Sequence, residues 1–273
     1  MIAVTGASGY VGGATARLLA ARGAPLRLVV RDAARAPDLG AEVRAASSYG
    51  AAEEMRAALD GADTVFLVPA EESPDRVEQH RTAVDAAVAA GVRRIVYLSF
   101  VDARPESTFT LGRHHWLTEE HVRASGAAYT FPRMNLYLDF FPRMVSEAGV
   151  IAGPGGEGRL AAVARDDVAA VCAELLLADG HDGRSYDITG REALSFAEVA
   201  AELSRLTGRE ITYKDETVEE AWASRASYGA PDWQVEAWIS TYTAVAAGEL
   251  EAVTDTVQRF TGRAPRTLAD VIS

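Results

Sequence analysis

The sequence predicts a doubly wound α/β fold, in which helices cover both faces of a parallel sheet. Short runs rich in Val, Leu and Ile alternate with amphipathic helical patterns from the first residue to about residue 134. Strands of this composition are buried on both faces, as is typical of parallel sheets. A glycine-rich turn between the first strand and the first helix supports the same fold.

The predicted elements follow one another in a regular order. Strands rich in aliphatic residues are expected at residues 1–5, 26–30, 41–46, 64–68, 93–99 and 127–133. Helices are expected at residues 10–23, 52–61, 76–91 and 112–126, where apolar residues recur at helical spacing. The crossovers are expected to be right-handed. Ligands of such folds bind outside the carboxyl ends of the strands.

Glycines mark the turn between the first strand and the first helix. In the stretch VTGASGYVGG, Gly6 permits a tight turn, Gly9 lets a pyrophosphate approach the backbone, and Gly12 lets the helix lie close to the strand. The amides at a helix N-terminus and the positive end of its dipole favour an anion there. A turn that binds nothing is the alternative, but the strand before it and the helix after it favour a dinucleotide. The expected phosphate-binding residues are Gly6, Ser8, Gly9, Tyr10, Val11 and Gly12.

The end of the second strand indicates which dinucleotide is preferred. An acidic residue there hydrogen-bonds the ribose 2′-hydroxyl of NAD, whereas an arginine accommodates the 2′-phosphate of NADP. Arg31 lies at this position and Arg35 lies about one helical turn later, so NADP(H) is the expected cofactor. Asp32 follows Arg31 directly and keeps NAD(H) open as an alternative.

Beyond about residue 135 the alternation of strands and helices changes. Expected there are a loop at Gly153–Gly158, helices at 165–180 and 195–208, short strands at 185–190 and 210–215, and mostly helix afterwards. Asp166 or Asp167 is expected to cap the first of these helices, and Ser195 with Glu198 forms a capping box at the second.

Two domains are therefore expected. Residues 1–134 form the NAD(P)-binding Rossmann domain, and residues 135–273 form a smaller, mainly helical, substrate-binding lobe. We expect this lobe to lie over the cofactor cleft, with some of its segments returning to the main sheet.

The segment HWLTEEHVRASGAAYTFPRMNLYLDFF, from His115 to Phe141, carries a further motif. Its pattern H-x-x-T-E, R-x-S-G and Y-T-x-x-R-x-N-x-Y-x-x-F resembles NmrA-like atypical short-chain dehydrogenases/reductases. Type 2 NADPH:quinone oxidoreductases and triphenylmethane reductases are the most similar members. The stretches VFLVPAEE, IVYLSFVDA and FTGRAPRTLADVI are similar to the same family, so the resemblance covers nearly the whole chain. It implies an NAD(P)H-dependent oxidoreductase.

The acid pair of the common short-chain reductases is absent from this chain. Those enzymes carry a Tyr and, four residues later, a Lys, where this sequence has Leu111 and His115. Lys214 is the only lysine, so no Tyr-x-x-x-Lys pair occurs anywhere. Reduction of a ketone that needs this acid is therefore not expected. A quinone or another flat aromatic acceptor spreads its negative charge, and the resemblance implies such a substrate.

Further site residues are expected near the ends of the strands. The resemblance places His115 against the cofactor, where proton exchange near neutral pH and a structural hydrogen bond to the ribose are equal alternatives. Asn135 and Tyr137 follow the sixth strand and would hold the carboxamide or the substrate, so they join His115 as candidate catalytic residues. The other expected cofactor contacts are Val68, Pro69, Ser99, Phe100 and Arg133, with Ser99 bonding the ribose or His115.

Two other functions stay open from the residues alone. The NmrA-like resemblance also implies a non-catalytic NADP(H)-binding redox sensor, and the missing Tyr–Lys pair suits that function as well. An oxygenase-type tailoring enzyme for aromatic polyketides is a third alternative, which no residue demands. Turnover of the cofactor separates an enzyme from a sensor.

Composition and charge restrict the partners. The chain has 273 residues and a formal net charge of −12, which argues against nucleic acids and anionic membranes. No apolar run is long enough to span a membrane, and a strand that begins at Met1 leaves no room for a secretory leader, so a cytoplasmic location is expected. The five histidines lack metal-ligand spacing, so no metal is expected. Glu119 and Glu120 are expected on a helix surface, and Cys172 is expected inside a helix. A small aromatic substrate is the expected partner, and a homo-oligomer is left open.

Overall fold

The computed structural model describes residues 1–272, and the chain divides into two compact units. Unit 1 consists of Met1–Phe100, His114–Arg133 and Asp166–Asp187, and unit 2 consists of Val101–Arg113, Met134–Arg165 and Ile188–Ser273. Each unit is therefore assembled from several stretches of chain. The expected division into domains at residue 134/135 stays a prediction, because compactness alone does not define a part that folds by itself.

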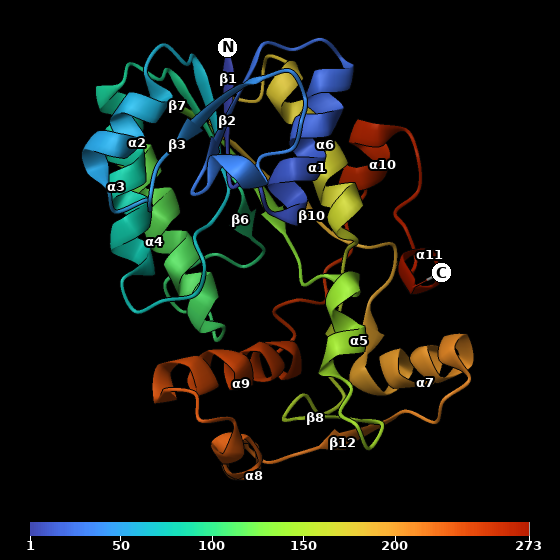
Figure 1. Ribbon diagram of the computed structural model, residues 1–273. Helices are drawn as coiled ribbons and strands as arrows, with labels where there is room; N and C mark the ends of the chain where they lie inside the picture. The colour runs from blue at the N-terminus through green and yellow to red at the C-terminus, as the bar shows by residue number, and fades with distance from the viewer. Residues whose placement is uncertain (273) are drawn as a thin grey trace. The chain divides into compact units, whose positions relative to one another are not determined.

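Unit 1 is built on a mostly parallel sheet with the strand order β10-β7-β5-β4-β1-β2-β3 (Figure 1). Its strands are β1 (Ile2–Thr5), β2 (Leu26–Val30), β3 (Glu42–Ala45), β4 (Thr64–Leu67), β5 (Arg94–Tyr97), β7 (Ala128–Met134) and β10 (Arg184–Ile188), and the short β6 (Ser99–Phe100) pairs with β7. All pairs from β7 through to β3 are parallel. The order reverses at β1, which has β2 on one side and β4 on the other. This arrangement confirms the doubly wound fold, and it brings the carboxyl ends of β1 and β4 together where such folds bind ligands.

Helices cover both faces of this sheet (Figure 1). One face carries α1 (Tyr10–Ala21) and α6 (Arg165–Leu177), and the other carries α2 (Ala52–Leu59), α3 (Arg76–Ala89) and α4 (Thr110–Ala124). Helix α1 turns Val11, Ala16 and Leu19 inward, and this helical spacing of apolar residues is the one that predicted the helix. The four helices expected between the six strands are therefore confirmed.

Helix α6 lies in unit 1, and it comes from residues 135–273, for which the sequence predicts a lobe with some segments returning to the main sheet. The Thr15 hydroxyl of α1 donates to the Ala169 carbonyl of α6 at 3.5 Å. The helix begins at Arg165, so Asp166 and Asp167 lie in its first turn and neither is the N-cap that was expected. Cys172 is completely buried in this helix, as the sequence predicted.

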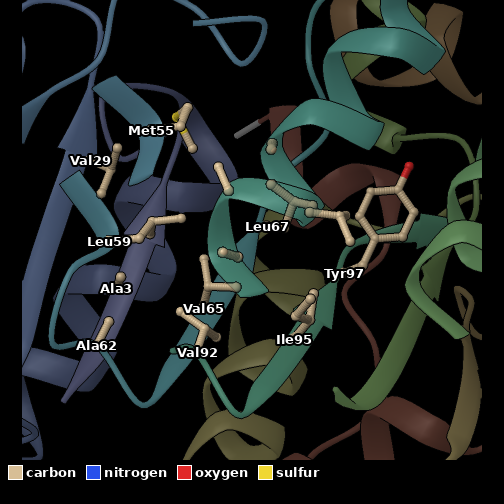
Figure 2. Close-up of a cluster of buried hydrophobic side chains, with 14 of the residues drawn as sticks. Ala3, Val29, Met55, Leu59, Ala62, Val65, Leu67, Val92, Ile95 and Tyr97 are labelled. Atoms are coloured by element: carbon tan, nitrogen blue, oxygen red, sulfur yellow. The ribbon is translucent and has the colours of Figure 1, made fainter. Parts of the chain in front are cut away.

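An aliphatic core fills the space between the sheet and helices α2 and α3 (Figure 2). Alternate residues of neighbouring strands point into it, namely Val65 and Leu67 from β4 and Ile95 and Tyr97 from β5, and Met55 of α2 covers them. Burial of one such side chain stabilises the fold by about 1.5–3 kcal/mol. The Tyr97 ring belongs to this core, while its hydroxyl points away from the aliphatic side chains (Figure 2).

Strand β3 differs from the other predicted strands of unit 1, because all four of its residues are exposed. It is the last strand in the sheet order and so has one unpaired edge. Its Glu42 carboxylate accepts from Arg27 of β2 at 2.8 Å and from Arg44 at 2.6 Å. The expectation of a strand buried on both faces was therefore wrong at this edge.

Unit 2 is mainly helical, as expected for the C-terminal part of the chain. Its helices are α5 (Phe141–Met144), α7 (Phe196–Thr207), α8 (Val218–Arg225), α9 (Asp232–Ala246), α10 (Thr256–Thr261) and α11 (Leu268–Ile272). Unit 2 also contains two small sheets. In one, β8 (Val150–Gly153) pairs with β12 (Thr212–Asp215), and in the other, β9 (Arg159–Leu160) pairs with β11 (Leu194–Ser195). The predicted capping box is confirmed, because Ser195 Oγ accepts from the Glu198 N–H and the Glu198 carboxylate accepts from the Ser195 N–H.

Glu119 lies inside unit 1 and is fully buried, so the expectation of a surface charge was wrong. Its carboxylate accepts hydrogen bonds from the Ser99 hydroxyl at 2.6 Å, from two nitrogens of Arg133 at 2.8 and 2.6 Å, and from Arg123 at 2.8 Å. A buried carboxylate keeps its charge only when it is paired in this way. Glu119 therefore ties α4 to β6 and β7.

We expect Glu119→Ala to lower the free energy of unfolding by about 3–5 kcal/mol, because it leaves the Arg133 guanidinium without its buried partner. Glu120→Ala is the matched control, since Glu120 pairs with Arg123 from the same helix but is 51% exposed. An exposed pair of this kind contributes about 0–1 kcal/mol. Urea unfolding of both variants measures the difference, and equal losses would contradict the assignment.

Candidate functional site

The turn between β1 and α1 brings Gly6 and Gly9 to the carboxyl end of β1. Gly6 has φ +60°, a left-handed conformation that favours glycine. The Gly9 N–H donates to the Gly6 carbonyl at 2.9 Å and closes the turn. Gly9 is also the N-cap of α1 and offers no side-chain cap. An α-helix leaves its first amides without an acceptor inside the helix, so an anion is favoured at this end.

The fold requires glycine at position 12 but not at position 9. A Cβ on Gly12 would lie 2.4 Å from the Gly6 carbonyl oxygen and 3.0 Å from that of Thr5, so α1 lies on β1 only without a side chain there. A Cβ on Gly9 would meet only the Gly6 oxygen, at 3.3 Å, and its φ of −87° is ordinary. An open glycine that folding does not demand fits a turn approached closely by a pyrophosphate.

The other residues of this turn divide between surface and core. Ser8 and Tyr10 are exposed, whereas Val11, the second residue of α1, is buried. The Tyr10 hydroxyl donates to the Asp166 carboxylate of α6 at 2.9 Å. The Tyr10 side chain is therefore engaged by α6, and the contacts of Ser8, Tyr10 and Val11 with a cofactor stay predictions.

Arg31 follows β2 and pairs with Glu71, which follows β4. The Arg31 Nη2 lies 2.7 Å from Glu71 Oε1, and Nη1 lies 3.4 Å from Oε2. The hydrogen bond and the charge of Glu71 raise the pKa of Arg31. Because β1 lies between β2 and β4, this pair reaches past the carboxyl end of β1, where the glycine turn begins. The side chains are 61% and 78% exposed, so the pair contributes little and Arg31 can exchange Glu71 for another anion.

A short turn follows Arg31, and it contains Asp32 and Arg35. Arg35 ends the 3-10 helix η1 (Ala33–Arg35) and is exposed. The Asp32 carboxylate accepts from the Ala34 N–H at 3.0 Å and caps this helix. Asp32 therefore has a local structural role, although it had kept NAD(H) open as an alternative.

The loop after β4 lies beside the glycine turn. The side chain of Val68 would lie 3.2 Å from a Cβ on Gly6. The Val68 N–H donates to Thr5 Oγ1 at 3.0 Å, and the Tyr49 hydroxyl lies 2.6 Å from both the Val68 carbonyl and Thr5 Oγ1. These contacts fix the backbone that leads into Pro69. Val68 and Pro69, where cofactor contacts are expected, thus lie at the same end of the sheet as the glycine turn.

His115 lies in α4 with both ring nitrogens bound by protein groups, and it is only 2% exposed. Its Nε2 is 3.2 Å from Arg76 Nη2, and its Nδ1 is 2.8 Å from the Tyr97 hydroxyl oxygen. A guanidinium only donates, so Nε2 must accept and Nδ1 must carry the proton that is donated to Tyr97. The Phe100 ring stacks on the imidazole with a centroid distance of 6.0 Å.

His80 of α3 also has both ring nitrogens in hydrogen bonds with protein groups. The Ala70 N–H donates to His80 Nε2 at 2.8 Å, so Nδ1 carries the proton and donates to Thr118 Oγ1 at 2.9 Å. The Thr118 hydroxyl donates in turn to the His114 carbonyl at 2.9 Å. Both histidines are therefore neutral and each has one defined tautomer.

Burial keeps these groups from changing charge near neutral pH. Burial lowers the pKa of His115 and of His80 well below the ordinary value, and the positive charge of Arg76 lowers both further. Burial also raises the pKa of the Tyr97 hydroxyl. Proton exchange by His115 finds no unoccupied ring nitrogen in this arrangement. A hydrogen bond from His115 to a ribose would likewise require one of its present contacts to change.

Ser99 and Arg133 meet at Glu119. Ser99 was expected to bond the ribose or His115, but its hydroxyl donates to Glu119. Arg133 binds the same carboxylate with two nitrogens and is 21% exposed. These two residues stabilise the strand ends, and their contact with a cofactor stays a prediction.

Asn135 and Tyr137 lie in unit 2. The Asn135 side chain is buried, donates to the Leu250 carbonyl at 3.0 Å and accepts from the Leu136 N–H at 2.7 Å. The Tyr137 hydroxyl donates to the Met134 sulfur. Both ends of the Asn135 amide are therefore engaged within the unit, and a catalytic role for either residue stays a prediction.

The sequence profile of the NmrA-like family matches residues 1–243. This chain belongs to the NmrA-like family. It is 35% identical over 277 residues to the NAD(P)H azoreductase of Xenophilus azovorans, covering 99% of this chain and 96% of that protein. It is 31% identical over 281 residues to quinone oxidoreductase 2 of Escherichia coli, covering 100% and 98% of the two chains.

Solved structures share the fold of this NmrA-like chain over almost its whole length. The NADPH-dependent quinone oxidoreductase from Escherichia coli, complexed with NADPH, matches with a TM-score of 0.90 and 31% identity, over 99% of this chain and 98% of that one. The triphenylmethane reductase from Citrobacter sp., complexed with NADP(H), matches with a TM-score of 0.88 and 29% identity, over 99% of both chains. The resemblance inferred from the segment at His115 is confirmed at the level of the family.

Two further features are absent from residues 1–272, a cluster of metal ligands and a membrane-spanning helix. No group of three or more His, Cys, Asp or Glu side chains in this range is arranged to hold a metal ion. Within the same range, none of the helices is both long and apolar enough to cross a bilayer.

Sequence reasoning missed Arg76, Tyr97 and Glu119 as parts of this NmrA-like site. Arg76 is one charge in the polar run EESPDR, and Tyr97 is one apolar residue of a strand. No local pattern distinguishes Arg76 and Tyr97, because their common partner, His115, lies 39 and 18 residues away in the sequence.

We expect Gly12→Ala to destabilise the fold and Gly9→Ala to leave it nearly unchanged. The first Cβ would meet two backbone carbonyls, and overpacking of this kind costs about 1–3 kcal/mol. The second meets one backbone oxygen at 3.3 Å, a tight contact that a shift of a few tenths of an ångström would relieve, and a Gly-to-Ala change at an N-cap costs about 1 kcal/mol or less. Urea unfolding midpoints of the two variants decide the matter, and a larger loss for Gly9→Ala would refute the different roles assigned to these glycines.

Proposed function

We propose that this chain is an NADPH-dependent oxidoreductase that reduces a quinone or another flat aromatic compound. The observation that carries the proposal is the glycine turn, where Gly9 stays open at the N-terminus of α1 although folding does not require it. The relatives support it, because they are named as an NAD(P)H azoreductase and a quinone oxidoreductase. Structures of two relatives are complexes with NADPH or NADP(H). NAD(H) is the second cofactor in this proposal.

Unit 1 offers a contact for each charged part of the cofactor. The backbone from Gly6 to Gly9 and the first turn of α1 would hold the pyrophosphate. Arg31, with Arg35 nearby, would bind the 2′-phosphate after releasing Glu71. The fixed loop at Val68 would border the cofactor beside the glycine turn.

The chain's own residues supply orientation rather than an acid. NADPH, when bound, supplies a hydride. A quinone that accepts a hydride becomes a hydroquinone anion, whose charge spreads over the ring, and this anion takes one proton from water to give the hydroquinone. His115 donates its ring proton to the Tyr97 hydroxyl oxygen, and burial raises the pKa of that hydroxyl, so the proposed mechanism uses neither as the proton donor. A ketone leaves a localised alkoxide that needs a proton at once, and it should be a poor substrate.

A non-catalytic sensor of NADP(H) is the second candidate. The closed network around His115 favours it too, because a protein that only binds a dinucleotide needs no available acid. The two functions differ in turnover alone.

One assay separates these functions. Loss of the nicotinamide absorbance is followed with a quinone, an azo dye, a triphenylmethane dye and an aromatic ketone, and the dissociation constant of NADPH is measured on the same preparation. Turnover of the first three acceptors with little of the ketone supports the reductase. Tight binding without turnover of any acceptor selects the sensor, and absence of binding rejects both.

Arg31→Ala should weaken NADPH binding by about tenfold to a hundredfold and NADH binding little, since a hydrogen bond to a charged group contributes roughly 1.5–3 kcal/mol. Release of Glu71 from its exposed pair offsets only a small part of this. Arg56→Ala is the matched control, because Arg56 is also an exposed arginine paired with a glutamate, Glu53. Calorimetric titration with both nucleotides tests it, and an equal loss for the two would remove Arg31 from the 2′-phosphate site.

His115→Ala should lower quinone turnover by less than about 10²-fold, because a positioned acid contributes 10²–10⁴-fold only where the transition state needs a proton. The measurement is the steady-state rate of a variant that is folded and still binds NADPH. Complete loss of quinone turnover in such a variant would make His115 an essential acid and contradict the proposed mechanism.

A further inference from the structure

Arg76 is a buried cation that forms no ion pair with a carboxylate among residues 1–272, although the charge of Glu72 acts on it. It is the first residue of α3 and is 4% exposed. Its Nε donates to the Ala70 carbonyl at 3.0 Å, and its Nη2 donates to His115 Nε2. Its Nη1 is buried and has no hydrogen-bond partner in this part of the chain. Burial accordingly lowers the pKa of Arg76.

Such a residue costs stability if its role is only structural. Burying a charge is expensive unless a counter-charge and full hydrogen bonding offset it. The other two buried arginines among residues 1–272 have a carboxylate partner, since Arg27 binds Glu42 and Arg225 binds Glu216. An apolar side chain of similar length would fill the same space as Arg76 at lower cost. What Arg76 does to its neighbour must therefore account for its presence.

That neighbour is His115, and Arg76 acts on it in two ways. Because a guanidinium has no acceptor, the contact forces His115 Nε2 to accept, and the ring proton must sit on Nδ1. Because the guanidinium is charged, it also opposes a second proton on the ring. The contact thus fixes the tautomer, the charge and the orientation of one imidazole.

The remaining groups around His115 do not reverse this effect. The titratable and charged groups that act on it are Arg76 and His80 from α3, Tyr97 from β5, His114 from its own helix and Arg133 from β7. None of them is a carboxylate. Burial and positive neighbours therefore act in the same direction.

We propose that Arg76 is a positioning residue, which holds His115 neutral, protonated on Nδ1 and donating to Tyr97. For turnover, this inference rests on the function proposed above. A neutral imidazole is useful there, because a nicotinamide ring becomes positively charged when it gives up a hydride, and a histidinium beside it would oppose that change. The reaction then depends on no protein proton between about pH 5.5 and 8.5, a window that spans the ordinary pKa of histidine near 6.5.

The first test is nitrogen NMR of His115 in the full chain, without any acceptor. In the native protein we expect a neutral ring with Nδ1 protonated and no titration between about pH 5.5 and 8.5. In Arg76→Met we expect the Nδ1 preference to be lost and the pKa to rise. Arg76→Lys keeps the charge, so it should restore the low pKa at least in part. Arg81→Met is the control, because Arg81 lies on the same helix and pairs with Glu78 at the surface.

The second test is the pH profile of kcat/KM with one quinone. We expect a flat profile for the native protein and Arg81→Met, and a limb that falls at low pH for Arg76→Met, as His115 becomes protonated there. A native His115 that titrates near its ordinary pKa overturns the inference, and so does a folded Arg76→Met with an unchanged His115 spectrum. If Arg76→Met does not fold, Arg76→Lys carries the test, and a His115 that titrates normally in it refutes a role of the charge.

The two proposals fail in different ways. If NADPH is neither bound nor oxidised but the NMR results are as expected, the proposed function fails and the role of Arg76 stands. If quinone turnover occurs but His115 titrates in the native protein, the role of Arg76 fails and the oxidoreductase stands.

Discussion

The close contact between α1 and β1 is the constraint on which the rest of unit 1 depends. Gly12 has no side chain, so the first turn of α1 lies directly on the carbonyls of Thr5 and Gly6. This contact places the N-terminus of the helix at the carboxyl end of β1. The loop after β4 is fixed to the same strand through the bond between Val68 and Thr5. The three loops that follow β1, β2 and β4 then meet at one edge because their strands are neighbours.

The parts of this structure that the sequence predicts well are those that local physics determines. Strands β1, β2, β4, β5 and β7 were found because a strand covered on both faces must be apolar, and α1 to α4 because a helix covered on one face is apolar at helical spacing. The glycine turn was found because the conformation of Gly6 and the contact of Gly12 exclude most other residues. The edge position of β3 was missed, because a short apolar run carries no record of how many neighbours its strand has.

The candidate site could be predicted only in its backbone part. Its polar side chains depend on partners distant in sequence, so the sequence predicts a surface charge at Glu119 and gives no local sign of the contact made by Arg76. Glu119 is buried because Ser99 and Arg133 reach it from two strands, and nothing near it in the sequence indicates this. The division of roles that results is plain. In the proposed site, backbone groups of the glycine turn would face the anion, whereas Glu119 and His115 are buried in hydrogen-bonded networks.

The charged edge of β3 has a consequence for how copies of this protein meet. The outer edge of a sheet exposes unpaired N–H and C=O groups, which invite another chain to add a strand. Here β3 carries Glu42 and Arg44, which pair with each other, and Glu42 also pairs with Arg27 of the neighbouring β2, so an incoming strand would have to lie beside these charges. The charged side chains of β3 therefore oppose growth of the sheet from one molecule into the next. Such growth is the first step toward fibrils.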